Sequence, residues 1–426
     1  MIVDFSVKNY GPFRDEAKLS LQCTAGKEHP ENVQKVAGIK GGLLTSAAVF
    51  GANASGKSKL FDAMTVLQEL VRQPAPANIS IPAYLPFKLS PRNKGAPISM
   101  ALTFTSGKLL FHYDIEFNSD KILHESLYYY PKGQRHKVFV RAGSDFSFGA
   151  GIVTGQKAIS KMTGLNSAYL AVAAQMNNKI CLQAHQEIVN NLIVLKGDLT
   201  PLINTIINKM NTNDDFKMKM AHALTAADLG IEDLNAEIKK QNLIDRKDLP
   251  PQLVGIPMAT GQTSANTPTL YMKHHVGTAA GVTDADRTFP ATVESMGTMR
   301  MFTVAGPIID ALQNGRTVVI DDFGAYLHHE LCTWLIHQFG TATNEKGAQL
   351  IVNSNDLLLI DTDELLRRDQ IYFTSKDSES GASTLYCLSD FRIREDLDAR
   401  KAYELGKFGA FPFINGGLQP CPAEQR

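Results

Sequence analysis

The sequence predicts an α/β fold in which a buried strand runs through a phosphate-binding loop into a helix. Residues 47–50 (AAVF) have the apolar character of a buried strand. The next eight residues, 51–58 (GANASGKS), fit the G-x-x-x-x-G-K-S spacing of such a loop. Far downstream, residues 317–320 (TVVI) form a second apolar run that ends in Asp321 and Asp322. Together these features predict a P-loop nucleotide-binding head.

The loop at residues 51–58 has the residue types that binding a polyphosphate requires. Glycines let backbone N–H groups turn toward the anion, Lys57 adds a positive charge, and the Ser58 hydroxyl is suited to ligate Mg²⁺. The segment from Lys59 to Gln73 supplies a helix whose N-terminal dipole favours an anion. The residues of this loop predicted to bind the nucleotide are Gly51, Asn53, Ala54, Ser55, Gly56, Lys57 and Ser58.

Composition is that of an ordinary globular protein. The 426 residues are 44% hydrophobic and 20% charged, and the 43 basic residues equal the 43 acidic ones. Binding to nucleic acid or membrane would therefore depend on local patches. The five cysteines are scattered without a C-x-x-C pair, no apolar run reaches the length of a membrane span, and the first residues lack a signal-peptide pattern. We expect a cytoplasmic protein that does not contact the membrane.

The two aspartates after residues 317–320 resemble a Walker B motif. A carboxylate at the end of the strand beside a phosphate loop can hold the water shell of Mg²⁺, and a second one can orient the attacking water. We assign the first role to Asp321 and the second to Asp322. The alternative is that Asp322 only caps the helix containing Leu327 to Phe339.

A third motif lies between the first two, at residues 294–300 (ESMGTMR). Ser295 has the chemistry of a helix N-cap, and the small Gly297 leaves backbone amides accessible. Taken alone, this is only a capped helix. Between a Walker A and a Walker B motif, it resembles the signature of ABC-type ATPases. In that class the signature of one subunit contacts the triphosphate held by another, so Ser295 and Gly297 are predicted nucleotide contacts across an ATP-linked homodimer.

The segment after Walker B resembles the same class with two departures. A buried strand, residues 349–352 (QLIV), is followed by Asn355 where ABC-type ATPases usually carry a histidine. Asparagine can bind a phosphate oxygen but cannot take up a proton. In addition, Asp322 replaces the usual catalytic glutamate. The predicted catalytic set is therefore Asp322, Lys57 and Asn355, with slow hydrolysis and a long-lived ATP-bound state.

Further segments resemble bacterial ABC-class proteins, called AAA family ATPases, of phage-defence loci. These are proteins of the AbiL, RloA, OLD and AriA type. The resemblance covers nearly the whole chain. It does not include the TOPRIM nuclease domain that some OLD-type relatives carry. Beyond the nucleotide motifs, the segments that carry it are residues 1–13, 224–233, 366–371, 385–391 and 408–414.

This resemblance implies an ATPase that uses ATP and Mg²⁺ as the sensor or scaffold of an abortive-infection system. Its ATP-dependent dimer or larger homo-oligomer would control a separate effector, a nuclease or toxin, in response to a phage-encoded trigger. The alternative is a clamp ATPase of repair type that binds DNA. Basic residues at Arg367-Arg368 and Arg392 to Lys401 give that alternative a weak signal.

Motif spacing predicts one ATPase head assembled from both ends of the chain. Residues 1–150 supply the Walker A part and an antiparallel sheet from Ile98 to Phe148, and residues 266–426 supply the signature, Walker B, switch and tail. Residues 151–265 are predicted to be a mainly helical insertion. Within it we expect helix from Asn166 to about Glu237, including residues 188–194. A loop rich in Pro, Gln, Asn and Thr is expected at 239–269.

Two other groups of polar residues, the aspartate pairs and the adjacent histidines, are predicted to have no catalytic or metal-binding role. The pairs Asp361-x-Asp363 and Asp396-x-Asp398 superficially resemble metal ligands, but charged loops favour solvated carboxylates. The adjacent histidines 274–275 and 328–329 are predicted to be surface or interface residues, because one metal ion rarely uses neighbouring side chains.

Overall fold

The computed structural model describes residues 1–150, 155–242, 264–276, 283–284, 287–392 and 398–412. It divides into two compact units. The first comprises Met1–Lys196, Ala311–Gly324 and His328–Arg426, and the second comprises Gly197–Asp310 and Ala325–Leu327.

A six-stranded sheet forms the centre of the first unit. Its order is β11-β15-β16-β5-β17-β18, with parallel pairing throughout except for the antiparallel edge strand β18. The inner strands are almost fully buried, as expected for parallel strands covered on both faces. The strands are β5 (Ser46–Gly51), β11 (Leu192–Leu195), β15 (Thr317–Ile320), β16 (Gln349–Asn353), β17 (Ile371–Lys376) and β18 (Ser383–Cys387).

A second, antiparallel sheet lies in the same unit, in the order β10-β9-β8-β7-β6-β1-β2. Its strands alternate buried and half-buried side chains, for example in β6 and β7. The prediction of an antiparallel sheet from residue 98 to 148 is thus confirmed, with the first strands of the chain added. The bounds are β1 (Ile2–Lys8), β2 (Ala17–Ser20), β6 (Ile98–Ser106), β7 (Leu109–Phe117), β8 (Ile122–Tyr130), β9 (His136–Ala142) and β10 (Asp145–Phe148).

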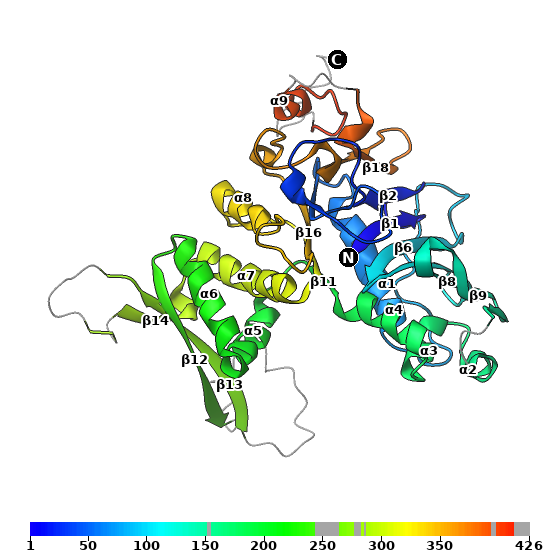
Figure 1. Cartoon of the computed structure of the whole chain (residues 1–426), viewed down its shortest axis with the longest axis horizontal. Helices are drawn as coiled ribbons and strands as arrows, with labels where there is room; N and C mark the ends of the chain where they lie inside the picture. The colour runs from blue at the N-terminus through cyan, green and yellow to red at the C-terminus, as the bar shows by residue number, and fades with distance from the viewer. Residues whose placement is uncertain (151–154, 243–263, 277–282, 285–286, 393–397, 413–426) are drawn as a thin grey trace, which may run out of the picture. The chain divides into compact units, whose positions relative to one another are not determined.

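Helices complete the first unit. Helix α1 (Lys57–Arg72) follows the phosphate loop and packs with α3 (Tyr169–Gln175) and α4 (Lys179–Asn190), as Figure 1 shows. Its buried residues recur at helical spacing, which gives it one apolar face. The remaining elements of this unit are β3 (Val33–Gln34), β4 (Leu43–Leu44), α2 (Gln156–Met162), α8 (His329–His337) and α9 (Ala399–Glu404).

The second unit combines helices with a small antiparallel sheet. Helices α5 (Thr200–Thr212) and α6 (Asp214–Ala226) lie beside the strands β12 (Ile231–Asn242) and β13 (Ser264–His274) (Figure 1). Strand β14 (Thr288–Pro290) pairs with β13. Helix α7 (Met296–Asn314) starts in this unit, and its last residues belong to the first.

Two predictions about the middle of the chain were wrong in part. Residues 192–194 are not helical, because β11 pairs in parallel with β15, with Leu192 opposite Thr317. Residues 231–237, the end of the predicted helical region, are not helical either, because they form the first part of β12 and pair with β13. Residues 239–242 and 264–269 are strand rather than loop, because β12 and β13 pair along their whole length. Residues 243–263 of the predicted loop lie outside the described residues. The predicted helices between residues 166 and 226 are present as α3 to α6.

Candidate nucleotide site

The phosphate loop connects β5 to α1 and has a backbone that requires glycine. Gly56, just before α1, has φ of 115°, a conformation that side chains rarely adopt. A Cβ atom added at Gly56 would lie 3.0 Å from the ring of Phe13 and 3.2 Å from Pro12. Ala54 also has a positive φ, of 63°. The loop is therefore tightly turned and closely packed against the turn that follows β1.

Lys57 sits inside this turn. Its Nζ donates to the carbonyl oxygens of Gly51 at 2.6 Å and Ala52 at 3.2 Å, and only 7% of the residue is exposed. Burial lowers the pKa of the Lys57 ammonium from its usual value, and the charges of Asp322 and Asp321 oppose that shift. The lysine charge thus lies near both carboxylates of the predicted Walker B motif.

An open cavity of about 470 Å³ brings together the phosphate loop, Asp322 and Asn355. It contains loop residues, Asp322 from the end of β15 and Asn355 from the segment after β16. Gly51, Ser55 and Asp321 are not among its lining residues. Ser55 is buried, and its hydroxyl lies 2.5 Å from the Thr374 hydroxyl on β17. The lining residues are Pro12, Ala52, Asn53, Ala54, Gly56, Lys57, Ser58, Lys59, Asp322 and Asn355.

Asn353 holds the two aspartates that follow β15. Its Oδ1 accepts a hydrogen bond from the Asp322 backbone N–H at 2.8 Å, and its Nδ2 donates to Asp321 Oδ1. Asn353 is fully buried at the end of β16, the strand paired with β15. Asp322 has φ of 49°, in the left-handed region. Asn353 was not among the residues predicted from the sequence, although its place at the end of an apolar strand was a usable signal.

The helix-cap alternative for Asp322 is wrong. The following helix, α8, begins at His329, and its N-cap is His328, whose Nδ1 accepts from the Glu330 N–H at 3.3 Å. Asp322 lies before that cap and lines the cavity instead. One of the adjacent histidines is thereby explained as a helix cap.

The signature segment is built as a capped helix start within the second unit. Ser295 Oγ accepts a hydrogen bond from the Thr298 N–H at 3.0 Å, the N-cap geometry of α7. A Cβ atom at Gly297 would lie 3.0 Å from the Tyr326 carbonyl oxygen, so the small residue permits a close backbone approach. Val293, Met296 and Tyr326 nearby are each between 64% and 67% exposed.

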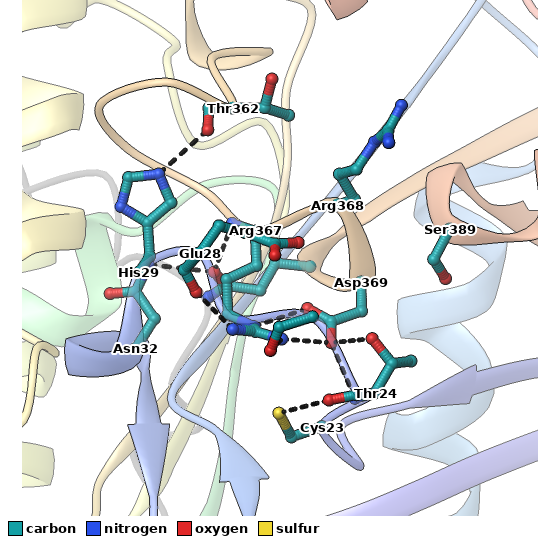
Figure 2. Close-up of polar contacts among 12 residues, drawn as sticks. Cys23, Thr24, Glu28, His29, Asn32, Thr362, Arg367, Arg368, Asp369 and Ser389 are labelled. Atoms are coloured by element: carbon teal, nitrogen blue, oxygen red, sulfur yellow. Dashed lines mark hydrogen bonds and ion pairs between the residues drawn. The ribbon is translucent and has the colours of Figure 1, made fainter. Parts of the chain in front are cut away.

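Arg367, part of the weak basic signal for DNA, is a structural residue. Only 1% of it is exposed, and its Nε and Nη2 donate to the two carboxylate oxygens of Asp369 at 2.9 and 3.0 Å. It also donates to the carbonyl oxygen of Glu28 (Figure 2) and to that of Gly26 at 3.0 Å. A buried guanidinium with all these partners cannot contact DNA phosphates. Residues 393–397, from the other basic segment, lie outside the described residues.

One residue of each aspartate pair, Asp361 in the first and Asp398 in the second, has structural partners. Asp361 Oδ1 accepts from the backbone N–H groups of Asp363 and Glu364, and Asp398 caps α9. Asp396 lies outside the described residues. Across the ranges that the structure describes, no helix is long and apolar enough to cross a membrane.

Four features together define a P-loop nucleotide-binding head. They are the buried strand β5, the loop that requires glycine, the buried Lys57 and the aspartate at the end of β15. A family model described as "AAA domain, putative AbiEii toxin, Type IV TA system" matches residues 46–361, and the chain belongs to this family. The match includes every motif from the phosphate loop to Asn355. The fold is the predicted α/β fold of a P-loop NTPase, with a mixed central sheet and a separate antiparallel sheet. No curated protein matches the sequence.

Solved structures similar to the chain include SMC head domains. The SMC head domain from Thermotoga maritima is 10% identical, with a TM-score of 0.42 over 91% of this chain and 98% of that one. The Smc head with an extended coiled coil bound to the C-terminal domain of ScpA, from Pyrococcus furiosus, is 10% identical. Its TM-score is 0.45 over 96% of this chain and 99% of that one. Similarity at this level carries no information about ligands or partners.

Proposed function

We propose that this protein binds and slowly hydrolyses ATP with Mg²⁺, and that it acts as the nucleotide-controlled sensor or scaffold of an anti-phage, abortive-infection system. The observation that carries the proposal is the cavity in which the phosphate loop, Lys57, Asp322 and Asn355 come together. In this view the ATP-bound assembly controls a separate effector, a nuclease or toxin, until a phage component is detected.

The residues present fit a polyphosphate and a hard divalent cation. The N-terminus of α1, the loop amides and Lys57 offer positive potential to phosphate oxygens. The Ser58 hydroxyl and the Asp321 carboxylate are oxygen ligands of the kind that Mg²⁺ prefers. When bound, Mg²⁺ would neutralise charge on the phosphate oxygens. Asn353 fixes the orientation of Asp321, so that carboxylate needs little rearrangement to serve as a ligand.

Slow hydrolysis follows from the residues at the two catalytic positions. Asp322 would orient the attacking water with a side chain one methylene shorter than glutamate. Asn355 lines the same cavity and can donate or accept a hydrogen bond at a phosphate oxygen, but it cannot carry a proton. Neither residue is equipped to drive fast turnover, which favours a long-lived bound state.

Self-association is supported by the surface around Ser295. The backbone N–H groups at the start of a helix point beyond its N-terminus and can bind an anion. The exposed apolar side chains Val293, Met296 and Tyr326 are suited to burial against another protein. In an ABC-type arrangement, the partner would be the nucleotide held by a second copy. ATP would then be part of the interface of a homodimer or larger homo-oligomer.

The defence role is supported by the family description, which names a toxin of a toxin–antitoxin system. It is also supported by the resemblance of the whole chain to phage-defence ATPases. The effector and trigger are proposals that rest on this resemblance.

The test is the mass of the purified protein by light scattering, with and without ATP and Mg²⁺. The wild type is compared with Lys57→Ala and Ser295→Arg, and with two surface controls, Lys219→Ala on α6 and Ser144→Arg in the turn between β9 and β10. Nucleotide-dependent assembly that is lost only in the first two variants supports the proposal. Assembly that is indifferent to ATP and to both substitutions would refute the composite site.

The defence role needs its own measurement. In the native genetic context, Lys57→Ala should abolish protection in a phage plating assay, whereas Lys219→Ala should retain it. If the wild type instead shows DNA-stimulated hydrolysis and salt-sensitive binding to duplex DNA, the clamp alternative would replace the defence role.

A further inference from the structure

Three residues near the end of the chain hold the phosphate loop from outside the cavity. These residues, Phe408 to Ala410, are called the tail segment below. The backbone N–H of Ala52 donates to the Ala410 carbonyl oxygen at 3.1 Å. Ala52 itself lines the nucleotide cavity, so one residue contacts both the tail segment and the site.

Each carbonyl group of the tail segment is held by a side-chain hydroxyl. Tyr386 on β18 donates to the Phe408 oxygen, Ser375 on β17 donates to the Gly409 oxygen at 2.9 Å, and Tyr403 on α9 donates to the Ala410 oxygen at 3.1 Å. Gly409 has φ of 71°, which lets the backbone present successive carbonyls to three different elements. Three hydroxyls on three consecutive carbonyls fix the backbone of the tail segment.

Aromatic stacking fixes the tail segment to the central sheet. The Phe408 ring stacks on Phe373 of β17, with centroids 5.1 Å apart and planes 16° from parallel, and Tyr403 stacks on Phe373 at the same distance and angle. Phe373 in turn approaches Phe50 of β5, with ring centroids 6.5 Å apart. The rings therefore connect the tail segment to the strand that leads into the phosphate loop.

We infer that the tail segment is a positioning element of the nucleotide site, and that it sets nucleotide affinity by fixing the first turn of the phosphate loop. The backbone contacts of Ala52 explain how the tail segment acts on the loop. The Ala52 N–H is bound by Ala410, while its own carbonyl oxygen accepts from the Ser55 N–H at 3.2 Å and from Lys57 Nζ at 3.2 Å. A loop that is already ordered loses less conformational entropy when a ligand binds.

This inference rests on the proposed nucleotide binding, and it differs from a purely structural role. If the tail segment only stabilised the fold, loosening it would lower the melting temperature and leave the affinity of the folded protein unchanged. If it positions the loop, loosening it must weaken nucleotide binding. Linkage requires the reciprocal effect, so bound nucleotide must also order the tail segment.

The experiment removes the hydroxyls and keeps the rings. The triple variant Tyr386→Phe, Ser375→Ala, Tyr403→Phe is compared with Tyr372→Phe, a control on the same strand as Ser375. The Tyr372 hydroxyl donates to the Ser20 carbonyl at 2.8 Å and accepts from the Ser20 N–H at 3.1 Å. Isothermal titration with ATP and Mg²⁺, well below the melting temperature, should show affinity weakened roughly ten-fold in the triple variant and less than two-fold in the control.

A second measurement follows hydrogen exchange. ATP should slow exchange of the peptide containing the tail segment in the wild type, and less so in the triple variant. Unchanged affinity in a triple variant whose melting temperature falls would overturn the inference. If the triple variant does not fold, the single variant Tyr403→Phe provides the test, and its affinity for ATP should be about three-fold weaker than that of the wild type. Unchanged affinity in that variant would likewise overturn the inference. A wild type that binds no nucleotide would instead overturn the proposed function on which the inference rests.

Discussion

Replacing Asn353 with alanine should lower the rate of ATP hydrolysis by more than the loss of folded protein can explain. Asn353 is fully buried, and it makes one hydrogen bond to the Asp322 backbone and one to the Asp321 carboxylate. A hydrogen bond to a charged group contributes about 1.5–3 kcal/mol and a neutral one about 0.5–1.5 kcal/mol, so the variant should lose about 2–4.5 kcal/mol of unfolding free energy. Loss of a group that orients a metal-binding carboxylate typically costs about 10- to 100-fold in activity.

Asn344 provides a matched control. It is also fully buried, and its amide donates to the carbonyls of Phe339 at 3.0 Å and Ala348 at 2.8 Å and accepts from the Ala348 N–H at 2.7 Å. These contacts lie before β16, whereas Asn353 lies at its end. Chemical denaturation should show similar losses in Asn344→Ala and Asn353→Ala. The steady-state rate of phosphate release, measured at several Mg²⁺ concentrations, should fall below the wild-type rate only in Asn353→Ala. Equal rates per folded molecule in the two variants would refute the reasoning.

Three further predictions concern the loop and the catalytic positions. Gly56→Ala should abolish nucleotide binding in titration and cost about 1–3 kcal/mol, because φ of 115° and the ring of Phe13 exclude a side chain. Gly107→Ala, at φ of 59° with no atom near the added Cβ, should cost about 1–2 kcal/mol and leave binding intact. Asp322→Glu should raise the turnover of ATP in steady-state assays, and a slower variant would contradict the assignment of slow hydrolysis to the short side chain. Burial lowers the pKa of Lys57, and phosphate binds the charged form of the side chain. The affinity for ATP, measured by titration at a series of pH values, should therefore begin to fall at a lower pH than it would with an ordinary lysine. Lys57→Arg should remove this fall.

Local signals predicted the parts of the site that depend on local geometry. The phosphate loop requires glycine at a left-handed position before a helix, and the sequence pattern encodes that requirement directly. The Ser295 N-cap is similarly local, since the hydroxyl binds an N–H three residues later. The antiparallel sheet was predictable because its strands are consecutive and their side chains alternate.

Residues that act through tertiary pairing could not be identified this way. Asn353 positions the carboxylates only because β16 pairs with β15 in a register that places Val352 opposite Ile320. Strand β11 has four apolar residues, too few to distinguish period 2 from period 3.6, and parallel pairing with β15 decides its conformation. In the second part of β12, residues 239–242, pairing with β13 outweighs a polar composition that favours a loop.

The conformation of Asp322 shows why a departure from a family pattern has more than one physical meaning. From sequence, aspartate in place of glutamate indicates only a shorter reach and slower chemistry. The structure adds a backbone reason, since φ of 49° is tolerated better by aspartate than by glutamate. The Asn353 side chain stabilises this conformation by binding the Asp322 N–H. Backbone strain and catalytic reach therefore act on the same residue, and a glutamate there must gain more from its longer side chain than it loses in the left-handed turn.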